Sequence, residues 1–250
     1  MPKIKPGLVS VTFRKLRPDE IIKLCAGAGI NAIEWGSDVH ATDEAAAKKI
    51  AELSEENGIE SVSLGSYYRA GGGEDFSRYI KIASALKTKN IRIWAGDKNS
   101  EDADGDYRAK IVSDAKAAAD LAAGFGMDVS FEYHGNTLTN TQESAVRLLG
   151  EIGRENVYTY WQPLGETTHD ENINNVKELC ALGKLKNMHV YYWDGGARLP
   201  LKEGADKWAG YFAAAEGFNG SALLEFVIND GAAEFISDAA VLKKLTGAGG

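Results

Sequence analysis

Short hydrophobic runs alternate with longer amphipathic runs along the whole chain. Eight of the short runs are rich in β-branched and aromatic residues, which is typical of strands; they cover residues 7–13, 31–35, 60–66, 90–96, 127–135, 156–163, 185–193 and 221–229. Apolar residues recur at helical spacing in the stretches between and after them, which cover residues 18–29, 42–58, 75–88, 104–125, 141–153, 169–183, 203–217 and 230–245. This strict alternation predicts a parallel sheet whose strands are connected by helices.

Eight strand–helix units in 250 residues fit one closed barrel. The alternative is a doubly wound open sheet, which usually has fewer units and carries a G-x-G-x-x-G turn between a strand and a helix. That turn is missing, because the glycines at 71–73 follow a loop. There is also no linker or low-complexity tract. We therefore predict an α/β protein with a single (β/α)8 TIM barrel domain over residues 1–250.

Composition narrows the class of protein further. The net charge of −8 disfavours binding to nucleic acid. Cys25 and Cys180 both fall in predicted helices, so we expect free thiols and no disulfide framework. The first ten residues lack the apolar core of a signal peptide, and no apolar run approaches the roughly 20 residues of a membrane span. The sequence therefore predicts a cytoplasmic protein without a nucleic-acid or membrane partner.

Aromatic and polar residues gather at the predicted carboxyl ends of the strands, where barrel enzymes place their active sites. Four of the five tryptophans and three of the four histidines fall there, whereas His169 is expected at the surface. Aromatic faces among polar groups suit a sugar-like small molecule. The predicted substrate-binding residues are Arg14, Trp35, His40, Tyr68, Arg69, Trp94, His134, Trp161, Trp193 and Arg198.

Glu132, His189 and Glu225 interrupt apolar strands. A charge that points into a barrel is costly unless it is paired or binds a metal ion. Oxygen and nitrogen donors without a thiolate suit Mn²⁺, Mg²⁺, Co²⁺ or Zn²⁺. The alternative is that the two glutamates pair with arginines of the rim, namely Arg14, Arg69 or Arg198. For Glu34, in the second predicted strand, pairing as a positioning residue is the favoured interpretation.

The order and spacing of these residues resemble the xylose isomerase-like TIM-barrel superfamily of sugar isomerases and epimerases, over the whole chain. In that family Glu, Asp, His and Glu from strands five to eight hold one divalent metal ion. The resemblance implies Glu132, His189 and Glu225 as ligands, with Mn²⁺ as the first choice of metal. Gln162 stands where the family has Asp, and the intervals through it are 30, 27 and 36 residues. Its amide oxygen can still bind metal, but it is neutral, which should weaken affinity and strengthen the ion as a Lewis acid.

The resemblance also implies the chemistry. Glu132 and Glu225 would be the catalytic residues that remove and return a proton next to a carbonyl group, in an isomerase or epimerase of a small sugar, keto-sugar or sugar acid. One alternative is a lyase that resembles inosose dehydratases, and another is a sugar-binding barrel without turnover, which the neutral Gln162 keeps open. The endonuclease branch of the superfamily needs more metal ligands than four histidines allow. Family members are commonly dimers or tetramers, so a homo-oligomer also stays open.

Overall fold

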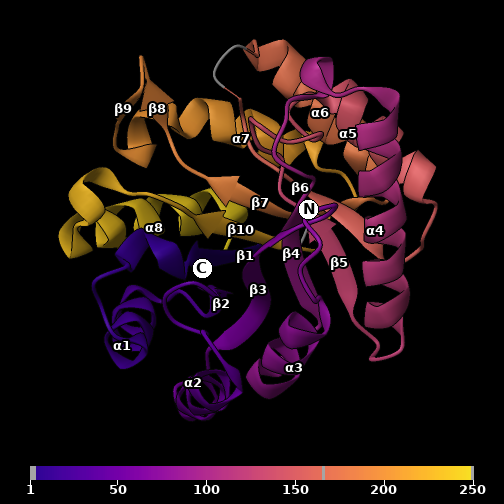
Figure 1. Ribbon diagram of the computed structural model, residues 1–250. Helices are drawn as coiled ribbons and strands as arrows, with labels where there is room; N and C mark the ends of the chain where they lie inside the picture. The colour runs from indigo at the N-terminus through magenta and orange to yellow at the C-terminus, as the bar shows by residue number, and fades with distance from the viewer. Residues whose placement is uncertain (1–3, 165–166, 249–250) are drawn as a thin grey trace.

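Eight parallel strands close into a barrel in the computed structural model, which describes residues 4–164 and 167–248 (Figure 1). Neighbouring strands follow the order β1-β10-β7-β6-β5-β4-β3-β2. The strands are β1 (Lys5–Val9), β2 (Ala32–Gly36), β3 (Glu60–Arg69), β4 (Asn90–Trp94), β5 (Asp128–Phe131), β6 (Val157–Trp161), β7 (Leu185–Val190) and β10 (Ser221–Leu224). The predicted (β/α)8 barrel is confirmed.

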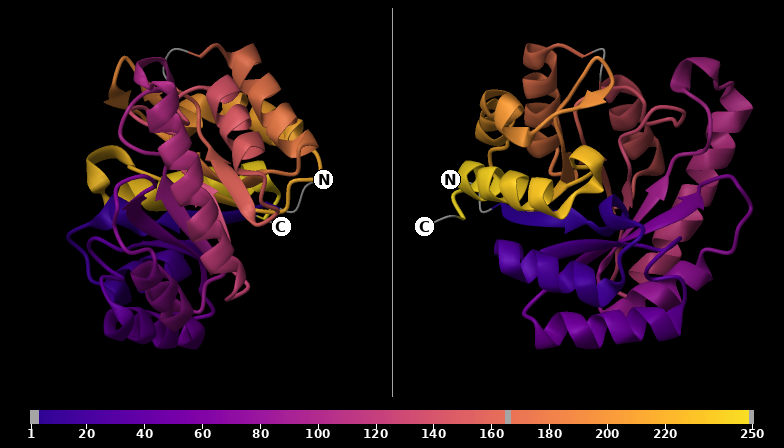
Figure 2. Two further views of the ribbon diagram at one scale, coloured as in Figure 1. Left: turned by 45° about the vertical axis from the view of Figure 1, so that its right-hand side comes forward. Right: turned by 90° about the vertical axis from the view of Figure 1, so that its left-hand side faces the viewer.

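A helix follows each barrel strand and packs on the outside of the barrel (Figures 1 and 2). The helices are α1 (Pro18–Ala28), α2 (Glu44–Glu56), α3 (Ser77–Leu86), α4 (Gly105–Ala123), α5 (Gln142–Ile152), α6 (His169–Ala181), α7 (Ala205–Ala214) and α8 (Ala232–Thr246). Local sequence sets their ends. Asp43 caps α2 by accepting a hydrogen bond from the backbone N–H of Ala46 at 2.8 Å, and Gly29 ends α1 in the left-handed conformation at φ 68°.

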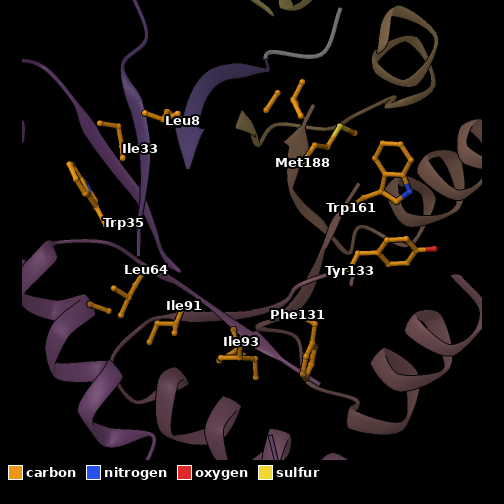
Figure 3. Close-up of a cluster of buried hydrophobic side chains, with 14 of the residues drawn as sticks. Leu8, Ile33, Trp35, Leu64, Ile91, Ile93, Phe131, Tyr133, Trp161 and Met188 are labelled. Carbon is orange, nitrogen blue, oxygen red and sulfur yellow. The ribbon is translucent and has the colours of Figure 1, made fainter. Parts of the chain in front are cut away.

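Side chains along each strand alternate between the helices and the barrel interior. Figure 3 shows the outward set, with Ile33, Leu64, Ile91 and Phe131 pointing away from the barrel axis toward the helices. The inward set holds a small apolar cluster with Val9 and polar side chains that reach the carboxyl end of the strands. Alternation therefore decides which residues can contribute to a site inside the barrel.

Six of the eight barrel strands, β1, β4, β5, β6, β7 and β10, end earlier than the sequence predicts. The first strand ends at Val9, and Ser10–Phe13 forms a 3₁₀ turn instead of continuing to residue 13. The seventh ends at Val190 and not at residue 193. Beyond it, β8 (Trp193–Asp194) and β9 (Ala197–Arg198) form an antiparallel hairpin, whose turn uses two glycines at φ 54° and 80°.

Both cysteines are free, as predicted; Cys25 is buried and Cys180 half-buried. Across residues 4–164 and 167–248, none of the helices combines the length and the apolar character that a membrane crossing requires.

Candidate active site

Three of the predicted metal ligands meet at the carboxyl end of the barrel. Glu132 follows β5, His189 lies in β7 and Glu225 follows β10, and each can offer a ligand atom within 4.8 Å of the others. His189 Nδ1 lies 3.2 Å from Glu225 Oε2 and 3.8 Å from Glu132 Oε1. All three side chains are buried. The barrel thus brings together two carboxylates and an imidazole nitrogen that are far apart in sequence.

Gln162 joins this cluster from the end of β6. Its Nε2 donates to the carbonyl of Tyr133 at 2.7 Å, and its Oε1 lies 3.2 Å from His189 Nδ1. Because a backbone carbonyl can only accept, the amide nitrogen must face Tyr133 and the oxygen must face the cluster. Two carboxylates, one imidazole and one amide oxygen are a donor set that fits a divalent ion.

A buried arginine lies on the opposite wall. Arg92 of β4 donates from Nε to Glu34 Oε1 at 2.8 Å and from Nη1 to the carboxylate of Glu132. Gly65 leaves room for this pair, since a Cβ there would lie 2.8 Å from Glu34 Oε1 and 2.9 Å from Arg92 Nη2. Glu34 therefore pairs with an arginine, as the sequence favours, and the arginine partner of Glu132 is Arg92 rather than one from the rim.

Below this pair, Glu34 is held by a tyrosine inside the barrel. The hydroxyl of Tyr160 donates to Glu34 Oε2 at 2.6 Å and accepts from Asn187 Nδ2 at 2.8 Å and from Asn90 Nδ2 at 3.1 Å. Burial and the Glu34 carboxylate raise the pKa of Tyr160 well above its usual value, so the phenol stays a donor. A hydrogen-bonded column thus connects the site to the interior of the barrel.

The buried charges shift one another's pKa values. Burial opposes the ionised form of Glu34, but Arg92 and His189 overcome it and lower its pKa to about 2. Burial likewise opposes protonation of His189, but Glu225 and Glu34 raise its pKa to about 10. Glu225 has a lowered pKa because His189 and Arg92 outweigh burial. Without a metal ion, the cluster therefore favours ionised Glu34 and Glu225 around an imidazolium, and a metal ion bound to this imidazole would have to displace a proton.

A pocket of about 330 Å³ opens over the cluster. Its polar lining includes Arg92, Glu132, Gln162 and Glu225. Its other lining residues include Tyr67, Trp94, His134, Tyr191, Trp193 and Phe226. A larger cavity of about 620 Å³ lies at the amino ends of the strands, but within the described ranges no trio of His, Cys, Asp or Glu converges there. The smaller pocket combines charges with aromatic faces and is the candidate active site.

Three predicted substrate-binding residues line this pocket. Trp94 stacks on His134 with ring centroids 4.9 Å apart, and Trp193 reaches the pocket from the β8–β9 hairpin. Arg69 covers the other side of Trp94, with its guanidinium carbon 4.0 Å from the ring centroid. Arg69 therefore braces an aromatic wall and is not itself part of the lining.

The other two rim arginines have similar places. Arg14 donates to the hydroxyl of Tyr67 at 2.6 Å and pairs with Asp38. Arg198 lies 5.0 Å from the ring centroid of Phe226 and pairs with Asp230 at 2.6 Å. Both arginines thus contact aromatic residues that line the pocket, and their charges already have carboxylate partners.

The remaining predicted substrate-binding residues lie away from the pocket. Trp35 points toward the helices and donates to Ser61 Oγ at 3.1 Å, and Trp161 packs against Trp208 and Tyr211. Each tryptophan is the strand neighbour of an inward residue, Glu34 or Gln162. Alternation of side chains therefore turns both indoles outward.

His40 and Tyr68 are also held outside the barrel. The ring of His40 lies within hydrogen-bond distance of Ser10 Oγ, at 2.9 Å, and donates to the carbonyl of Leu16 at 3.2 Å. Tyr68 donates to Asp114 Oδ2 at 2.6 Å. These contacts satisfy both side chains within the protein, so the structure does not bring them to the pocket.

Sequence reasoning missed Arg92, Tyr160 and Phe226. Arg92 interrupts the apolar run NIRIW as Glu132 interrupts its own strand, so the same rule could have found it. Tyr160 reads as an ordinary strand residue, and only barrel closure brings it to Glu34, 126 residues away. Phe226 holds a positive φ of 55°, which no local pattern indicates for a phenylalanine.

Comparison with known proteins agrees with the resemblance drawn from the sequence. A model of the xylose isomerase-like TIM barrel family matches residues 22–245. A 3-dehydroshikimate dehydratase from Bacillus anthracis is 26% identical over 167 residues, which cover 62% of this chain and 60% of that protein. The alignment thus spans less than two thirds of the relative's length.

Solved structures share the fold. The crystal structure of the probable 3-DHS dehydratase AsbF from Bacillus anthracis has a TM-score of 0.76 at 22% identity, covering 97% of this chain and 99% of that one. A crystal structure of D-psicose 3-epimerase, in the presence of D-fructose, has a TM-score of 0.71 at 15% identity, covering 99% and 100%. At these identities the similarity shows the barrel alone.

Proposed function

Because this chain belongs to the xylose isomerase-like TIM barrel family, we propose that it is an enzyme acting on a small sugar, keto-sugar or sugar acid. In this proposal it removes a proton from the carbon next to a carbonyl group and completes an isomerisation or epimerisation. The observation that carries the proposal is the convergence of Glu132, His189, Glu225 and the Gln162 oxygen beneath a pocket of about 330 Å³.

One divalent ion, with Mn²⁺ as the first choice, would be held by Glu132, Gln162, His189 and Glu225. When bound, such an ion supplies positive charge that polarises a carbonyl group and stabilises the charge that develops on its oxygen. The orientation of Gln162 supports this assignment, because its hydrogen bond to Tyr133 turns the amide oxygen toward His189. Two carboxylates also suffice to balance a divalent charge.

Glu132 and Glu225 are the proposed catalytic carboxylates. They enter the pocket from strands that are three positions apart around the barrel, so they approach a bound molecule from different sides. One accepts the proton from the carbon, and the same or the other group returns it. The faces of Trp94 and Trp193 would pack on the CH groups of the substrate and exclude water.

Dehydration is the second candidate, and one feature of the site favours it. Arg92 binds Glu132, whereas the ion-pair partner of Glu225 in the described parts of the chain is His189. Two carboxylates in unequal surroundings suit a reaction in which one group takes the carbon-bound proton and the other protonates a departing hydroxyl group. The dehydratase relative points to the same reaction.

The metal ion is tested first. Elemental analysis of the purified protein should find about one divalent ion per chain, and Glu225→Gln should release it because one carboxylate ligand is lost. Glu52→Gln makes the same chemical change on the exposed face of α2 and should leave the metal content unchanged. A wild-type protein that is metal-free and equally stable with and without chelator contradicts the metal centre.

The reaction is tested in D₂O with Mn²⁺, using a panel of ketoses, sugar acids and 3-dehydroshikimate. Deuterium entering the carbon next to the carbonyl, with a product of unchanged composition, supports isomerisation or epimerisation. A product lighter by one water, with a new conjugated chromophore, supports dehydration. Tight binding without exchange for any compound would instead support a binding protein.

A further inference from the structure

Glu34 is fully buried directly behind the candidate metal ligand His189. The imidazole presents Nδ1 to Glu225 and Gln162, each at 3.2 Å. Its other nitrogen, Nε2, faces the opposite way and lies 3.8 Å from Glu34 Oε1. Nε2 is buried and makes no hydrogen bond to any residue in the described parts of the chain. The Glu34 carboxylate is thus close enough for its charge to influence which ring nitrogen keeps a proton.

We propose that Glu34 is a positioning residue that holds the His189 ring with Nδ1 toward the metal site and keeps its proton on Nε2. The inference rests on the proposed metal centre. A neutral imidazole carries one N–H and one lone pair, and the partner of one nitrogen decides which is which. A carboxylate behind Nε2 therefore leaves the lone pair of Nδ1 to a metal ion, and it also makes that nitrogen more basic.

Both oxygens of Glu34 are fixed in a way that suits this role. Oε1 accepts from Arg92 Nε at 2.8 Å, and Oε2 accepts from the Tyr160 hydroxyl at 2.6 Å. The missing Cβ of Gly65 lets the carboxylate lie close against β3, since a Cβ there would come within 2.8 Å of Oε1. Because each oxygen has its own donor, the carboxylate is held in one orientation, with Oε1 3.8 Å from His189 Nε2.

The matched pair of variants lies on one strand. Glu34→Gln keeps the volume and removes the charge, whereas Ile33→Val alters the neighbouring side chain, which packs between the barrel and the helices. Mn²⁺ affinity is measured by titration calorimetry on the full chain after chelation. We expect the dissociation constant to rise about 10–100-fold for Glu34→Gln and to stay unchanged for Ile33→Val.

The spectroscopic readout is the His189 N–H. In Zn²⁺-loaded protein with ¹⁵N-labelled histidine, we expect Nδ1 to bind the ion and Nε2 to carry a proton protected from exchange. Glu34→Gln should shift this N–H resonance and speed its exchange, which a loss of packing alone would not do. If Glu34→Gln fails to fold, Tyr160→Phe tests the positioning role instead. It removes the hydrogen bond to Glu34 Oε2 but keeps the ion pair with Arg92, and it should raise the dissociation constant for Mn²⁺ about 2- to 10-fold.

The outcomes separate this inference from the proposed function. If the wild-type protein binds no divalent ion, both the proposed metal centre and the positioning role of Glu34 are overturned. Normal wild-type binding, together with unchanged affinity and an unchanged His189 resonance in Glu34→Gln, overturns the positioning role alone. Binding of the ion through Nε2, with the proton on Nδ1, would also overturn it.

Discussion

Replacing Arg92 with methionine should destabilise the metal-free protein by about 3–5 kcal/mol. The Arg92 side chain is 3% exposed, and the Glu34 and Glu132 side chains that it binds are 0% and 6% exposed. Water can therefore replace very little of what the guanidinium provides. Methionine fills much of the volume but leaves two buried carboxylates without their cation, which is why the cost exceeds that of a surface ion pair.

The assay is urea unfolding at neutral pH in chelator, with the slope of the transition checked for constancy. Arg147→Met is the matched control, because that arginine is 64% exposed on α5 and pairs with Glu151; its loss should cost less than about 1 kcal/mol. The double variant Arg92→Met/Glu132→Gln should recover part of the stability, since it removes one uncompensated charge.

A divalent ion provides a second test of the electrostatic role of Arg92. Mn²⁺ should stabilise Arg92→Met more than it stabilises the wild type, because the ion then replaces a missing positive charge beside Glu132. If Arg92→Met unfolds like Arg147→Met, or if the double variant is no more stable than Arg92→Met, the buried carboxylates do not depend on the guanidinium and the electrostatic account of the site is refuted.

Three further outcomes follow from the site. In chelator, the free energy of unfolding of the wild type relative to His189→Asn should fall between pH 6.5 and 10, by up to about 1.4 kcal/mol per pH unit. The raised pKa of His189 stabilises the folded protein fully below pH 6.5, and this gain is lost as the pH rises through about 10. Parallel pH profiles of the two proteins would refute this. Gly65→Ala should lower the free energy of unfolding by about 1–3 kcal/mol, because the added methyl group crowds Glu34 and Arg92. Gly150→Ala, in open space on α5, should instead raise it by about 0.5–1 kcal/mol. Equal effects of the two variants in urea unfolding would refute the crowding. Gln162→Asp should tighten Mn²⁺ binding at least about tenfold in calorimetry, and unchanged affinity would count against Gln162 as a ligand.

The barrel could be predicted because its signals are local. Each strand–helix unit shows its own change of hydrophobic period, and eight such changes suffice to define the fold class. The three candidate ligands, Glu132, His189 and Glu225, were also local signals, since each interrupts an apolar run of the sequence. The strand ends were harder to predict. The chain leaves β7 at Val190, and the glycine pair at 195–196 is the local signal for the hairpin that follows.

The sequence predicts in part which strand side chains point into the barrel and which point toward the helices. Assigning Glu34 and Gln162 to the interior requires Trp35 and Trp161 to point outward, so strand alternation alone excludes both tryptophans from the pocket. The Tyr160 contact with Glu34 could not be read in this way. It depends on the shear of the closed barrel, which sets how far each strand slides along its neighbour and has no signature within one strand.

The charges around the pocket give the neutral Gln162 a physical reason. Glu34, Glu132 and Glu225 are buried beside a single guanidinium, that of Arg92. With a divalent ion bound and His189 neutral, these charges balance, whereas a carboxylate in place of Gln162 would leave the site negative. A balanced site opposes a negatively charged ligand less than a negative one does. It can also stabilise more of the charge that develops when a proton leaves the carbon next to a carbonyl. In the proposed metal centre, a neutral Gln162 would therefore oppose a substrate that carries a carboxylate, such as a sugar acid, less than an aspartate would.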